Sequence, residues 1–509
     1  MTQAFLGIDV GTTGCKIIAI DEEGKVLDSE IVEYPIYTPR VGWTEQNPED
    51  WWNAAKEAMR RIISRKRVPS ESIQGIGLTG QMHGLVIIDN EEKIIRPAIL
   101  WNDQRTFREA EFINNKFSIE SIIKITGSIV QTGFTAPKLL WVKNNELENF
   151  RRIKKFMLPK DYVGFKLTGD VYTDVNDASG TSLFDVERRR WAEDLITELD
   201  LSPQIFPDVL ESSEVRGEIS KEVADELGLK PGTIVVAGAG DQGAAGVGAG
   251  AVTEGILSVN IGTSGVVFTS SDKYRFDPRG RLHAFCHASP SKWHLMGVML
   301  AAGGSLRWFR DTFCQLEKII GELIDEDPYN IIVREAAGLP TGSEGLIFLP
   351  YLSGERTPHA DPYARGVFFG LSLKHGKGHI VRSILEGVAY GLMNSLELMR
   401  EVGVTFSEVR LLGGGSRSLL WRRIIADVFG LRTSLLKVDE GSSYGAAILA
   451  TVGVGVYRNV EDAVSEIVRT VEPLDPDLSE HGKYKKYYEL YNRLYKVLKD
   501  EFRRLVEIM

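Results

Sequence analysis

A strand–turn–strand pattern built around Gly-Thr-Thr-Gly or Gly-Thr-Ser-Gly occurs twice in this chain. GIDVGTTGCKIIAI begins at residue 7, and SVNIGTSGVVFTS begins at residue 258. In each copy, two apolar runs flank a tight glycine turn, which is typical of antiparallel strands. A chain of 509 residues is also too long for one hydrophobic core. The repetition therefore predicts two similar halves, which we place at 1–248 and 249–509.

Helix-like and strand-like segments alternate along the chain. Residues 47–65 carry apolar side chains at helical spacing, whereas 73–80, 85–89, 94–101 and 234–238 read as strands. This alternation favours an α/β architecture with mixed sheets and flanking helices.

The end of the chain predicts an amphipathic helix after Gly482. Its aromatic side chains recur at three- and four-residue steps: Tyr484, Tyr488, Tyr491 and Tyr495. The mix of Lys, Arg and Tyr could form a nucleic-acid face, but we expect the aromatic stripe to pack on the core. The formal net charge of −10 also argues against a nucleic-acid partner.

The cysteines and the apolar runs predict a cytoplasmic location. Three cysteines without a CxxC pair argue against a disulfide framework. We see no signal peptide at the N-terminus and no apolar run long enough for a membrane span. We therefore expect no membrane partner.

The first glycine turn offers several candidate phosphate ligands in one short stretch. They are the backbone of Gly11 and Gly14, the hydroxyls of Thr12 and Thr13, and the ammonium of Lys16. Asp9 precedes them, and a carboxylate beside phosphates is reasonable if Mg²⁺ lies between. One such turn alone would favour a plain hairpin. A second turn at Gly262-Thr263, in the other half, favours a polyphosphate site, although neither turn has the Walker spacing.

Asp241 follows the strand at 234–238 and precedes a Gly/Ala-rich segment that reads as a helix. An Asp at this place is either a helix N-cap or a general base for a hydroxyl group. The cap is the better interpretation for the residue alone. The two phosphate turns make the base the better one, and we expect Gln242 to orient a neighbour.

Two further glycine-rich stretches follow in the second half. Residues 412–416, LGGGS, lie between a strand and the helix LLWRRIIADVFG, and a helix N-terminus there suits an adenosine or phosphate group. GSSYGAAILA at 441–450 predicts close helix–helix packing instead. A cluster of His and Cys at 283–294 does not predict a metal site, because the spacing of these residues on two strands is wrong for zinc: His283, Cys286, His287 and His294.

The stretch GLTGQMHGLV at 77–86 places Gln81, Met82 and His83 between two strand-like runs. It is either a polar turn or the floor of a binding site. Among two phosphate turns and Asp241, the binding site is the better interpretation.

These motifs resemble the FGGY carbohydrate kinases, within the actin-like ATPase superfamily, over essentially the whole chain. GFTAPKLLWVKNN (133–145) and GVFFGLSLKHGKGHIVRSILE (366–386) are similar to the two family signatures. DVGTTGCK, NIGTSG and LLGGGSRS are similar to its phosphate and adenosine motifs. GQMHGLV, ILWNDQRT, TDVNDASGTSLFDV, AGAGDQGAAGVGAG and FCHASPSKWHLMGV resemble the subgroup that phosphorylates D-xylulose.

The resemblance implies two actin-like (ribonuclease H-like) ATPase domains with the sugar deep in the cleft between them and ATP across its mouth. It implies ATP and Mg²⁺ as cofactors, Asp241 as the base, and Asp9 as the Mg²⁺ ligand, through water. The residues implied to lie at the sugar are Gln81, Met82, His83, Trp101, Asn102, Asp241 and Gln242. Those implied to lie at the nucleotide are Thr12, Thr13, Lys16, Gly262, Thr263, Gly303, Gly304, Arg307, Gly414, Gly415 and Ser418. A homodimer is compatible with this resemblance.

One stretch departs from the family pattern. The helix at 441–450 begins EGSSYGAA, where the family likeness would have a bulkier or Pro-containing start. We expect no effect on activity. The alternatives are another FGGY kinase that acts on gluconate, ribulose or a polyol, a non-catalytic actin-like ATP-binding or filament protein, and a sugar-responsive repressor, against which the missing helix-turn-helix extension argues.

Overall fold

The computed structural model describes residues 3–508, and they form two compact units. Unit 1 comprises the chain up to Thr253 together with Ser270–His294 and Glu440–Arg469. Unit 2 comprises Glu254–Thr269, Leu295–Asp439 and the chain from Thr470. Each compact unit is therefore built from several separate stretches of the chain.

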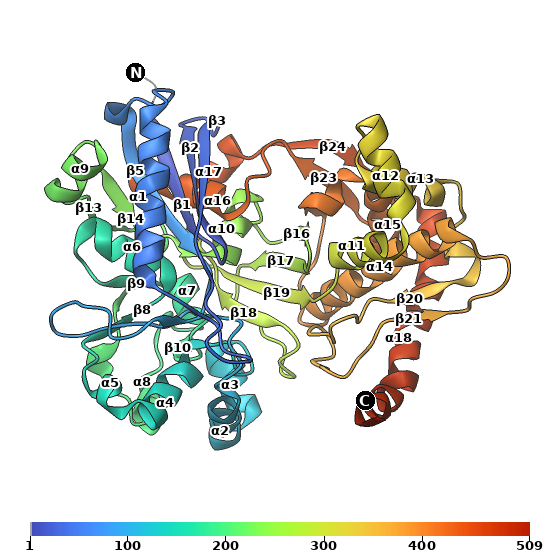
Figure 1. Ribbon diagram of the computed structural model, residues 1–509, viewed down its shortest axis with the longest axis horizontal. Coiled ribbons are helices and arrows are strands. Elements are labelled where there is room, and N and C mark those ends of the chain that lie inside the picture. Colours follow the sequence, from blue (N-terminus) through green and yellow to red (C-terminus); the bar gives the residue numbers. More distant parts are fainter. Residues whose placement is uncertain (1–2, 509) are drawn as a thin grey trace. The chain divides into compact units, whose positions relative to one another are not determined.

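The central sheet of unit 1 is mixed, as expected (Figure 1). Its strands follow the order β13 (Val215–Glu218), β14 (Ile234–Val236), β5 (Ile73–Gly80), β1 (Ala4–Val10), β2 (Gly14–Asp21) and β3 (Val26–Glu33), and β15 (Ala239–Gly240) pairs with β5. The hairpins β1–β2 and β2–β3 are antiparallel, whereas β5 is parallel to β1. The carboxyl ends of β1 and β5 therefore lie together, with Asp9 beside Thr79 and Val10 beside Gly80.

Helices cover both faces of this sheet. Helices α1 (Pro48–Ser64) and α6 (Pro159–Thr168) pack on one another and on the sheet, and α10 (Asp241–Gly248) and α16 (Gly441–Gly453) form a second pair. A Cβ atom on Gly7 would lie 1.9 Å from the Ser443 carbonyl oxygen, and one on Gly77 would lie 1.8 Å from that of Ala446. The small residues of α16 and these glycines thus allow backbone-to-backbone contact. The packing role expected for 441–450 is confirmed, and it explains why α16 belongs to unit 1.

The remaining elements of unit 1 form a lower layer with its own apolar core. Its helices are α2 (Phe107–Phe117), α3 (Ile119–Thr126), α4 (Thr135–Asn145), α5 (Leu147–Arg151), α7 (Val175–Ser179) and α8 (Glu193–Glu198), while α9 (Lys221–Leu227) and α17 (Val460–Ile467) lie elsewhere in the unit. Short strands accompany them: β4 (Glu45–Gln46), β6 (Val86–Ile88), β7 (Ala98–Ile99), β8 (Lys155–Met157), β9 (Tyr172–Asp174), β10 (Phe184–Asp185), β11 (Arg190–Trp191), β12 (Asp208–Leu210) and β18 (His283–Cys286). The strand expected at 94–101 is thus reduced to β7, which begins directly after Pro97, a residue that cannot donate to a strand ladder.

Unit 2 repeats the strand pattern of unit 1. Its main strands are β17 (Gly265–Ser271), β16 (Ile256–Ile261), β22 (Glu408–Leu412), β23 (Arg432–Leu436) and β24 (Thr470–Leu474), in that order. The hairpin β16–β17 is antiparallel and β22 is parallel to β16, which matches β1–β2 and β5. The internal similarity read from the two glycine turns is therefore confirmed.

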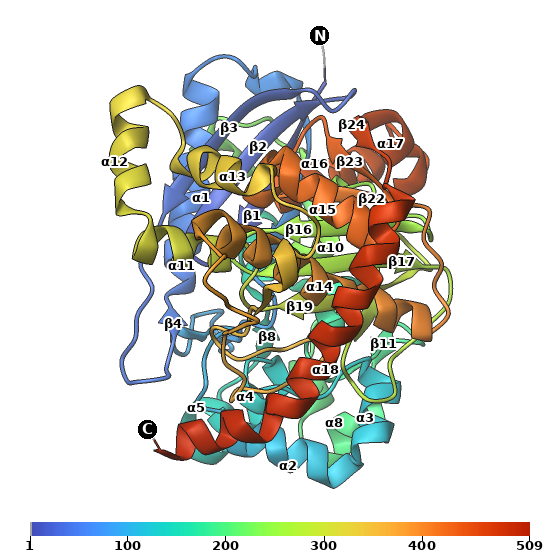
Figure 2. The ribbon, with the colours of Figure 1, turned by 90° about the vertical axis from the view of Figure 1, so that its right-hand side faces the viewer.

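The helices of unit 2 surround this sheet. They are α11 (Gly303–Phe313), α12 (Gln315–Ile324), α13 (Pro328–Ala337), α14 (Lys377–Glu401), α15 (Leu419–Phe429) and α18 (Leu478–Ile508). Strand β19 (Trp293–Met299) continues the sheet beside β17, and the short strands β20 (Ile347–Leu349) and β21 (Val367–Phe369) pair with each other. The last helix, red beside α15 in Figure 2, begins at Leu478 rather than after Gly482. It buries Tyr484, Tyr491 and Tyr495, as the aromatic stripe predicted. No helix among residues 3–508 is both long and apolar enough to span a membrane.

Candidate active site

Asp9 lies near the end of β1, where the strand leads into the first glycine turn. Its Oδ2 accepts a 2.5 Å hydrogen bond from the Ser442 hydroxyl, at the start of α16. Its Oδ1 is buried and has no hydrogen-bond partner among the described residues. Burial raises the pKa of Asp9, and the Ser442 hydrogen bond and the charge of Lys16 oppose that rise. The EGSSYGAA start of α16 therefore reaches this carboxylate directly.

The unpaired oxygen of Asp9 fits a cation ligand. Mg²⁺ commonly takes one or two carboxylates and completes its octahedron with phosphate oxygens and water. Within residues 3–508, no three His, Cys, Asp or Glu side chains are grouped to hold a metal ion. A Mg²⁺ ion at Asp9 would therefore need its other ligands from phosphate and water, which suits Mg²⁺ better than zinc.

The first glycine turn is held by side chains from two other segments. The Thr12 hydroxyl accepts a hydrogen bond from Trp101 Nε1 (3.0 Å) and donates one to Gln81 Oε1 (3.5 Å). Gln81 Nε2 donates to the carbonyls of Gly11 (3.2 Å) and of the Gln46 side chain (2.9 Å). Gln81 is almost fully buried, so its amide braces the turn.

Two other residues of this turn differ in their surroundings. Thr13 is exposed, whereas Lys16 is only partly so. The Lys16 ammonium lies 2.6 Å from Glu440 Oε2 and also donates to the Glu440 carbonyl at 3.3 Å. In this structure its charge is thus already paired within unit 1.

Met82 and His83 follow the end of β5 and lie against apolar side chains. The Met82 side chain is almost fully buried in a cluster with Phe134 and Ala178. The His83 ring stacks on Phe134, with centroids 4.2 Å apart and planes 14° apart. His83 also has a left-handed backbone, with φ of 69°. The turn therefore packs both side chains against Phe134.

One nitrogen of the His83 imidazole has a defined role. Nδ1 lies 2.7 Å from the Gly180 carbonyl oxygen, which can only accept, so Nδ1 donates this hydrogen bond. In the neutral ring, Nε2 is then the acceptor nitrogen. The backbone carbonyl of His83 accepts hydrogen bonds from Lys138 Nζ (2.7 Å) and the Thr135 hydroxyl (3.1 Å). Both donors belong to α4, within the GFTAPKLLWVKNN signature.

Trp101 and Asn102 follow β7. Trp101 is 40% exposed even though its indole nitrogen is bonded to Thr12. Asn102 Oδ1 is buried and has no hydrogen-bond partner among the described residues. An unsatisfied buried oxygen of this kind is unusual in a native structure and is often explained by a missing ligand or water.

Asp241 is the first residue of α10, and Gly240 occupies the N-cap position. Asp241 Oδ1 accepts a 2.8 Å hydrogen bond from the backbone N–H of Gln242. Burial, followed by the negative charge of Asp9, raises the pKa of Asp241 to about 7, and hydrogen bonds from Gln242 oppose the rise. The N-cap interpretation of Asp241 is therefore wrong by one position, because the N-cap is Gly240. The Asp241 carboxylate has the pKa of a general base near neutrality.

The second glycine turn, in unit 2, forms the entrance to helix α11. The backbone N–H groups of Gly303 and Gly304 donate to the carbonyls of Gly262 (2.8 Å) and Thr263 (3.0 Å). Arg307, one turn into the helix, donates to the Thr263 hydroxyl at 3.1 Å. Hydrogen bonds thus join the second glycine turn to the first turns of α11.

Unit 2 contains a cavity of about 860 Å³ next to this turn. A volume of this order suits a nucleotide-sized ligand. Every unit 2 residue that the sequence analysis placed at the nucleotide lines it: Gly262, Thr263, Gly303, Gly304, Arg307, Gly414, Gly415 and Ser418. The Ser418 hydroxyl also caps α15, since it accepts from the Trp421 N–H at 3.3 Å.

Several site residues had escaped the sequence analysis. Helix α13 contributes one wall of the cavity through Tyr329, Asn330, Val333 and Ala337. No glycine motif marks this helix, so no sequence signal identified it. Ser442 was missed because it meets Asp9 across 433 positions of the chain.

The His and Cys cluster at 283–294 lies on β18, β19 and the turn between them, as expected. His287 Nδ1 accepts from the Ser289 N–H at 2.8 Å, and Nε2 lies 3.1 Å from the Ala251 carbonyl. Burial lowers the pKa of His287 to about 3 and also lowers the pKa of His294. His287 is therefore a neutral, hydrogen-bonded core residue.

The comparisons with known proteins agree over the whole chain. The model for the N-terminal domain of the FGGY family of carbohydrate kinases matches residues 4–248, and that for its C-terminal domain matches 257–454. The chain is 37% identical over 495 residues to the xylulose kinase of Bacillus subtilis (strain 168), covering 97% of each chain. It is 38% identical to that of Escherichia coli (strain K12), covering 97% of this chain and 99% of the relative.

A solved structure and a more distant relative extend this result. A structure described as a xyloylose kinase from Brucella ovis has a TM-score of 0.89 at 36% identity, and the match covers 98% of this chain and all of that one. The gluconokinase of B. subtilis (strain 168) is 31% identical, covering 100% of this chain and 98% of the relative. Both domain models, the full-length relatives and the repeated sheet pattern lead to one conclusion: the chain belongs to the FGGY family of carbohydrate kinases.

Proposed function

We propose that this protein is an ATP-dependent kinase that transfers the γ-phosphoryl group of ATP to the 5-hydroxyl of D-xylulose, giving D-xylulose 5-phosphate. Its full-length relatives named xylulose kinase support this substrate. The structural observation that carries the proposal is Asp241. It is a carboxylate at a helix start with a pKa of about 7, in the same unit as the Met82–His83 turn.

In this mechanism Asp241 accepts the proton of the attacking sugar hydroxyl. His83 offers an acceptor nitrogen to another hydroxyl, and Met82 offers an adaptable apolar surface. The backbone of the two glycine turns binds phosphate oxygens, and the cavity of unit 2 takes the nucleoside. Asp9 would hold Mg²⁺ through water, and the bound ion would neutralise phosphate charge. Positioning and charge neutralisation carry most of the catalysis in such reactions.

A substrate panel tests the proposal. Formation of ADP is measured with D-xylulose, D-ribulose, a polyol and gluconate, each at several concentrations. We expect the highest kcat/KM for D-xylulose. A higher value for any of the other three would replace the proposed substrate and leave the kinase assignment intact.

Gluconate is the second candidate, because one of the relatives is a gluconokinase. An anionic sugar acid favours a cation in the sugar pocket. Near the Met82–His83 turn, Lys138 Nζ donates to the His83 carbonyl, and burial lowers the pKa of Lys138 well below its ordinary value. Lys160 pairs with Asp161 (2.5 Å) and Asp174 (2.7 Å). Neither lysine therefore suits an anionic sugar acid, which favours a neutral sugar.

A non-catalytic ATP-binding protein is separated from a kinase by the same assay. It would release ADP at the same rate with and without D-xylulose. The proposed kinase releases ADP faster with the sugar and forms one sugar phosphate per ADP. We also propose a cytoplasmic location and a homodimer. Light scattering of the purified protein tests the homodimer.

Replacing His83 with Ala is expected to raise the KM for D-xylulose about tenfold, because a hydrogen bond to a buried polar partner is lost. The KM for ATP should stay within about twofold, because the nucleotide cavity lies in unit 2. His83→Asn is the matched variant, since Asn tolerates the left-handed backbone better than Ala. Equal increases in both KM values would show that the turn is only scaffold.

The pH profile is expected to follow Asp241. A base must be deprotonated to act, so kcat/KM should be constant above a pKa of about 7 and fall about tenfold per pH unit below it. Steady-state rates with D-xylulose at constant Mg²⁺ measure this. A flat profile down to about pH 5 would contradict the assignment, since the ionised form would then be present throughout.

A further inference from the structure

Asn176 lies beside the start of the helix that carries Asp241, and its role is not explained by the proposed mechanism. Its side chain is fully buried. Oδ1 accepts a 3.0 Å hydrogen bond from the backbone N–H of Gly240, the residue directly before Asp241. Nδ2 donates at 2.6 Å to the carbonyl of Cys286 on β18. One amide thus joins a strand to the start of the catalytic helix.

The amide also packs closely against the first turn of α10. A Cβ atom on Gly243 would lie 2.2 Å from Asn176 Oδ1 and 2.4 Å from its Cγ. Gly243 therefore leaves just enough space for the Asn176 side chain. Any movement of this amide has to move either the Gly240 peptide or the helix turn, because both are in contact with it.

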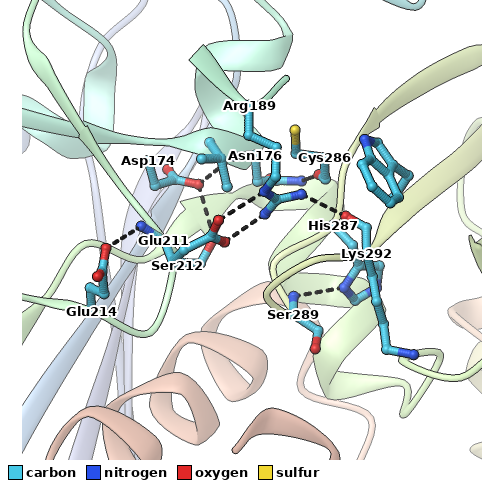
Figure 3. A network of polar contacts seen from close by, with 12 residues as sticks. Asp174, Asn176, Arg189, Glu211, Ser212, Glu214, Cys286, His287, Ser289 and Lys292 are labelled. Carbon is cyan, nitrogen blue, oxygen red and sulfur yellow. Dashed lines mark hydrogen bonds and ion pairs between the residues drawn. The ribbon is translucent and has the colours of Figure 1, made fainter. Parts of the chain in front are cut away.

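Asn176 is itself fixed by a network of polar contacts (Figure 3). Asp174 Oδ1 accepts from the backbone N–H of Asn176 (2.8 Å) and from the Ser212 hydroxyl (3.0 Å). Cys286, whose carbonyl accepts from the Asn176 amide, donates its own backbone N–H to the Ser179 hydroxyl at 3.1 Å. The amide therefore has a rigid support on both sides, as side chains that orient a functional group commonly do.

The segment that contains Asn176 also contacts the Met82–His83 turn, which we propose binds the sugar. Gly180, directly after α7, accepts the Nδ1 proton of His83 at 2.7 Å. A Cβ atom on Gly180 would lie 2.7 Å from the His83 ring, and one on Gly240 would lie 2.7 Å from Met82 Cγ. Helix α7 and the residue after it thus contact both the segment that precedes Asp241 and the segment that contains His83.

We propose that Asn176 is a positioning residue for Asp241: its amide fixes the Gly240 peptide and so sets the direction in which the Asp241 carboxylate leaves the helix. This inference rests on the proposed role of Asp241 as the base. A displacement of about 1 Å at a reacting group can cost on the order of 10²-fold in rate. A side chain that only stabilised the fold would leave kcat unchanged in protein that is still folded.

The test compares Asn176→Ala with a matched control in the same unit. Asn114 is partly buried and also makes two amide hydrogen bonds to the backbone, donating to the Val130 carbonyl (2.9 Å) and accepting from the Val130 N–H (3.2 Å). Both variants are assayed well below their measured Tm. We expect Asn176→Ala to lower kcat by about 10- to 100-fold with the KM for ATP within about twofold, and Asn114→Ala to keep the wild-type kcat.

A double variant shows whether the effect passes through Asp241. If Asn176 acts by orienting the base, Asn176→Ala lowers the residual rate of Asp241→Asn by less than about twofold. The proposal is overturned if kcat of the single variant is unchanged, or if the two losses multiply in full.

A second substitution covers the case in which Asn176→Ala does not fold. Gly243→Ala keeps the amide but displaces it, and we expect the same loss of kcat. Gly482→Ala in α18 is its control, because an added Cβ there meets no atom within 4 Å. An unchanged kcat in Gly243→Ala would overturn the proposal.

The failure of this inference can be told apart from the failure of the proposed function. If the wild-type protein phosphorylates no D-xylulose, the substrate assignment is wrong, and the comparison is repeated with the sugar that it does phosphorylate. A crystal structure of Gly243→Ala reports the position of Asp241 without any assay. An unmoved Gly240–Asp241 segment in that structure would also overturn the proposal.

Discussion

Asp241→Asn is expected to lower kcat by at least about 10²- to 10⁴-fold, the usual contribution of a general base. The amide keeps the shape of the carboxylate but cannot accept the proton of the sugar hydroxyl. The surroundings of the residue should survive, because the bond from the Gln242 N–H needs only an acceptor oxygen. Calorimetric titrations should therefore find near-wild-type affinities for ATP and D-xylulose, and a coupled assay should find the loss of turnover.

The control for this prediction is an Asp in the first turn of another helix of unit 1. Asp194 occupies such a position in α8 and is exposed. Asp194→Asn should leave kcat unchanged, since its carboxylate faces solvent. Near-wild-type turnover in Asp241→Asn would refute the assignment of the base, even if binding of both substrates were intact.

Asp9→Asn is expected to lower kcat by about 10²- to 10³-fold, as is usual when one preorganised electrostatic group is removed. The Asp9 carboxylate, whose Oδ1 has no hydrogen-bond partner in the described structure, becomes a neutral amide and loses its affinity for a cation. More Mg²⁺ should then be needed for half-maximal activity. A titration with Mn²⁺ in the presence of ADP, followed by electron paramagnetic resonance, should detect weaker metal binding independently of turnover.

The same variant has a second expected effect, on pH dependence. The negative charge of Asp9 contributes to the raised pKa of Asp241, so its removal should move the fall in kcat/KM to lower pH. Ser442→Ala is the control, because it removes the hydrogen bond to Asp9 but leaves the carboxylate. It should cost much less than Asp9→Asn. Equal losses in the two variants would show that Asp9 acts through its contact with α16 and not as a cation ligand.

Short-range sequence patterns predicted the framework of this protein well. The two glycine turns identified the hairpins β1–β2 and β16–β17, because φ/ψ freedom and β-branched runs are local properties. The Gly/Ala run after residue 240 predicted the start of α10 for the same reason. The boundaries were less accurate: α18 begins four residues earlier than Gly482, and Pro97 shortens the strand at 94–101 to β7.

The candidate site was predicted only in part. Asp9, His83 and Asp241 stood out because each polar side chain lies at the end of an apolar strand or shortly after it. Ser442 and Asn176 did not stand out, although TDVNDASG had been noticed as a motif. Their partners lie 433 and 64 positions away along the chain, and a contact of that separation leaves no local pattern.

The amino-acid sequence by itself determined the family, the two-fold repetition of the sheet pattern and the chemical types available for catalysis. Only the tertiary structure decided how those side chains are used. It showed that Gln81 braces the first glycine turn, that Lys16 pairs with Glu440, and that α16 belongs to unit 1. It also raised the pKa of Asp241, because desolvation and the nearby charge of Asp9 depend on packing in three dimensions. The identity of a residue sets its chemistry, whereas its neighbours across the fold set its pKa, its hydrogen bonds and its direction.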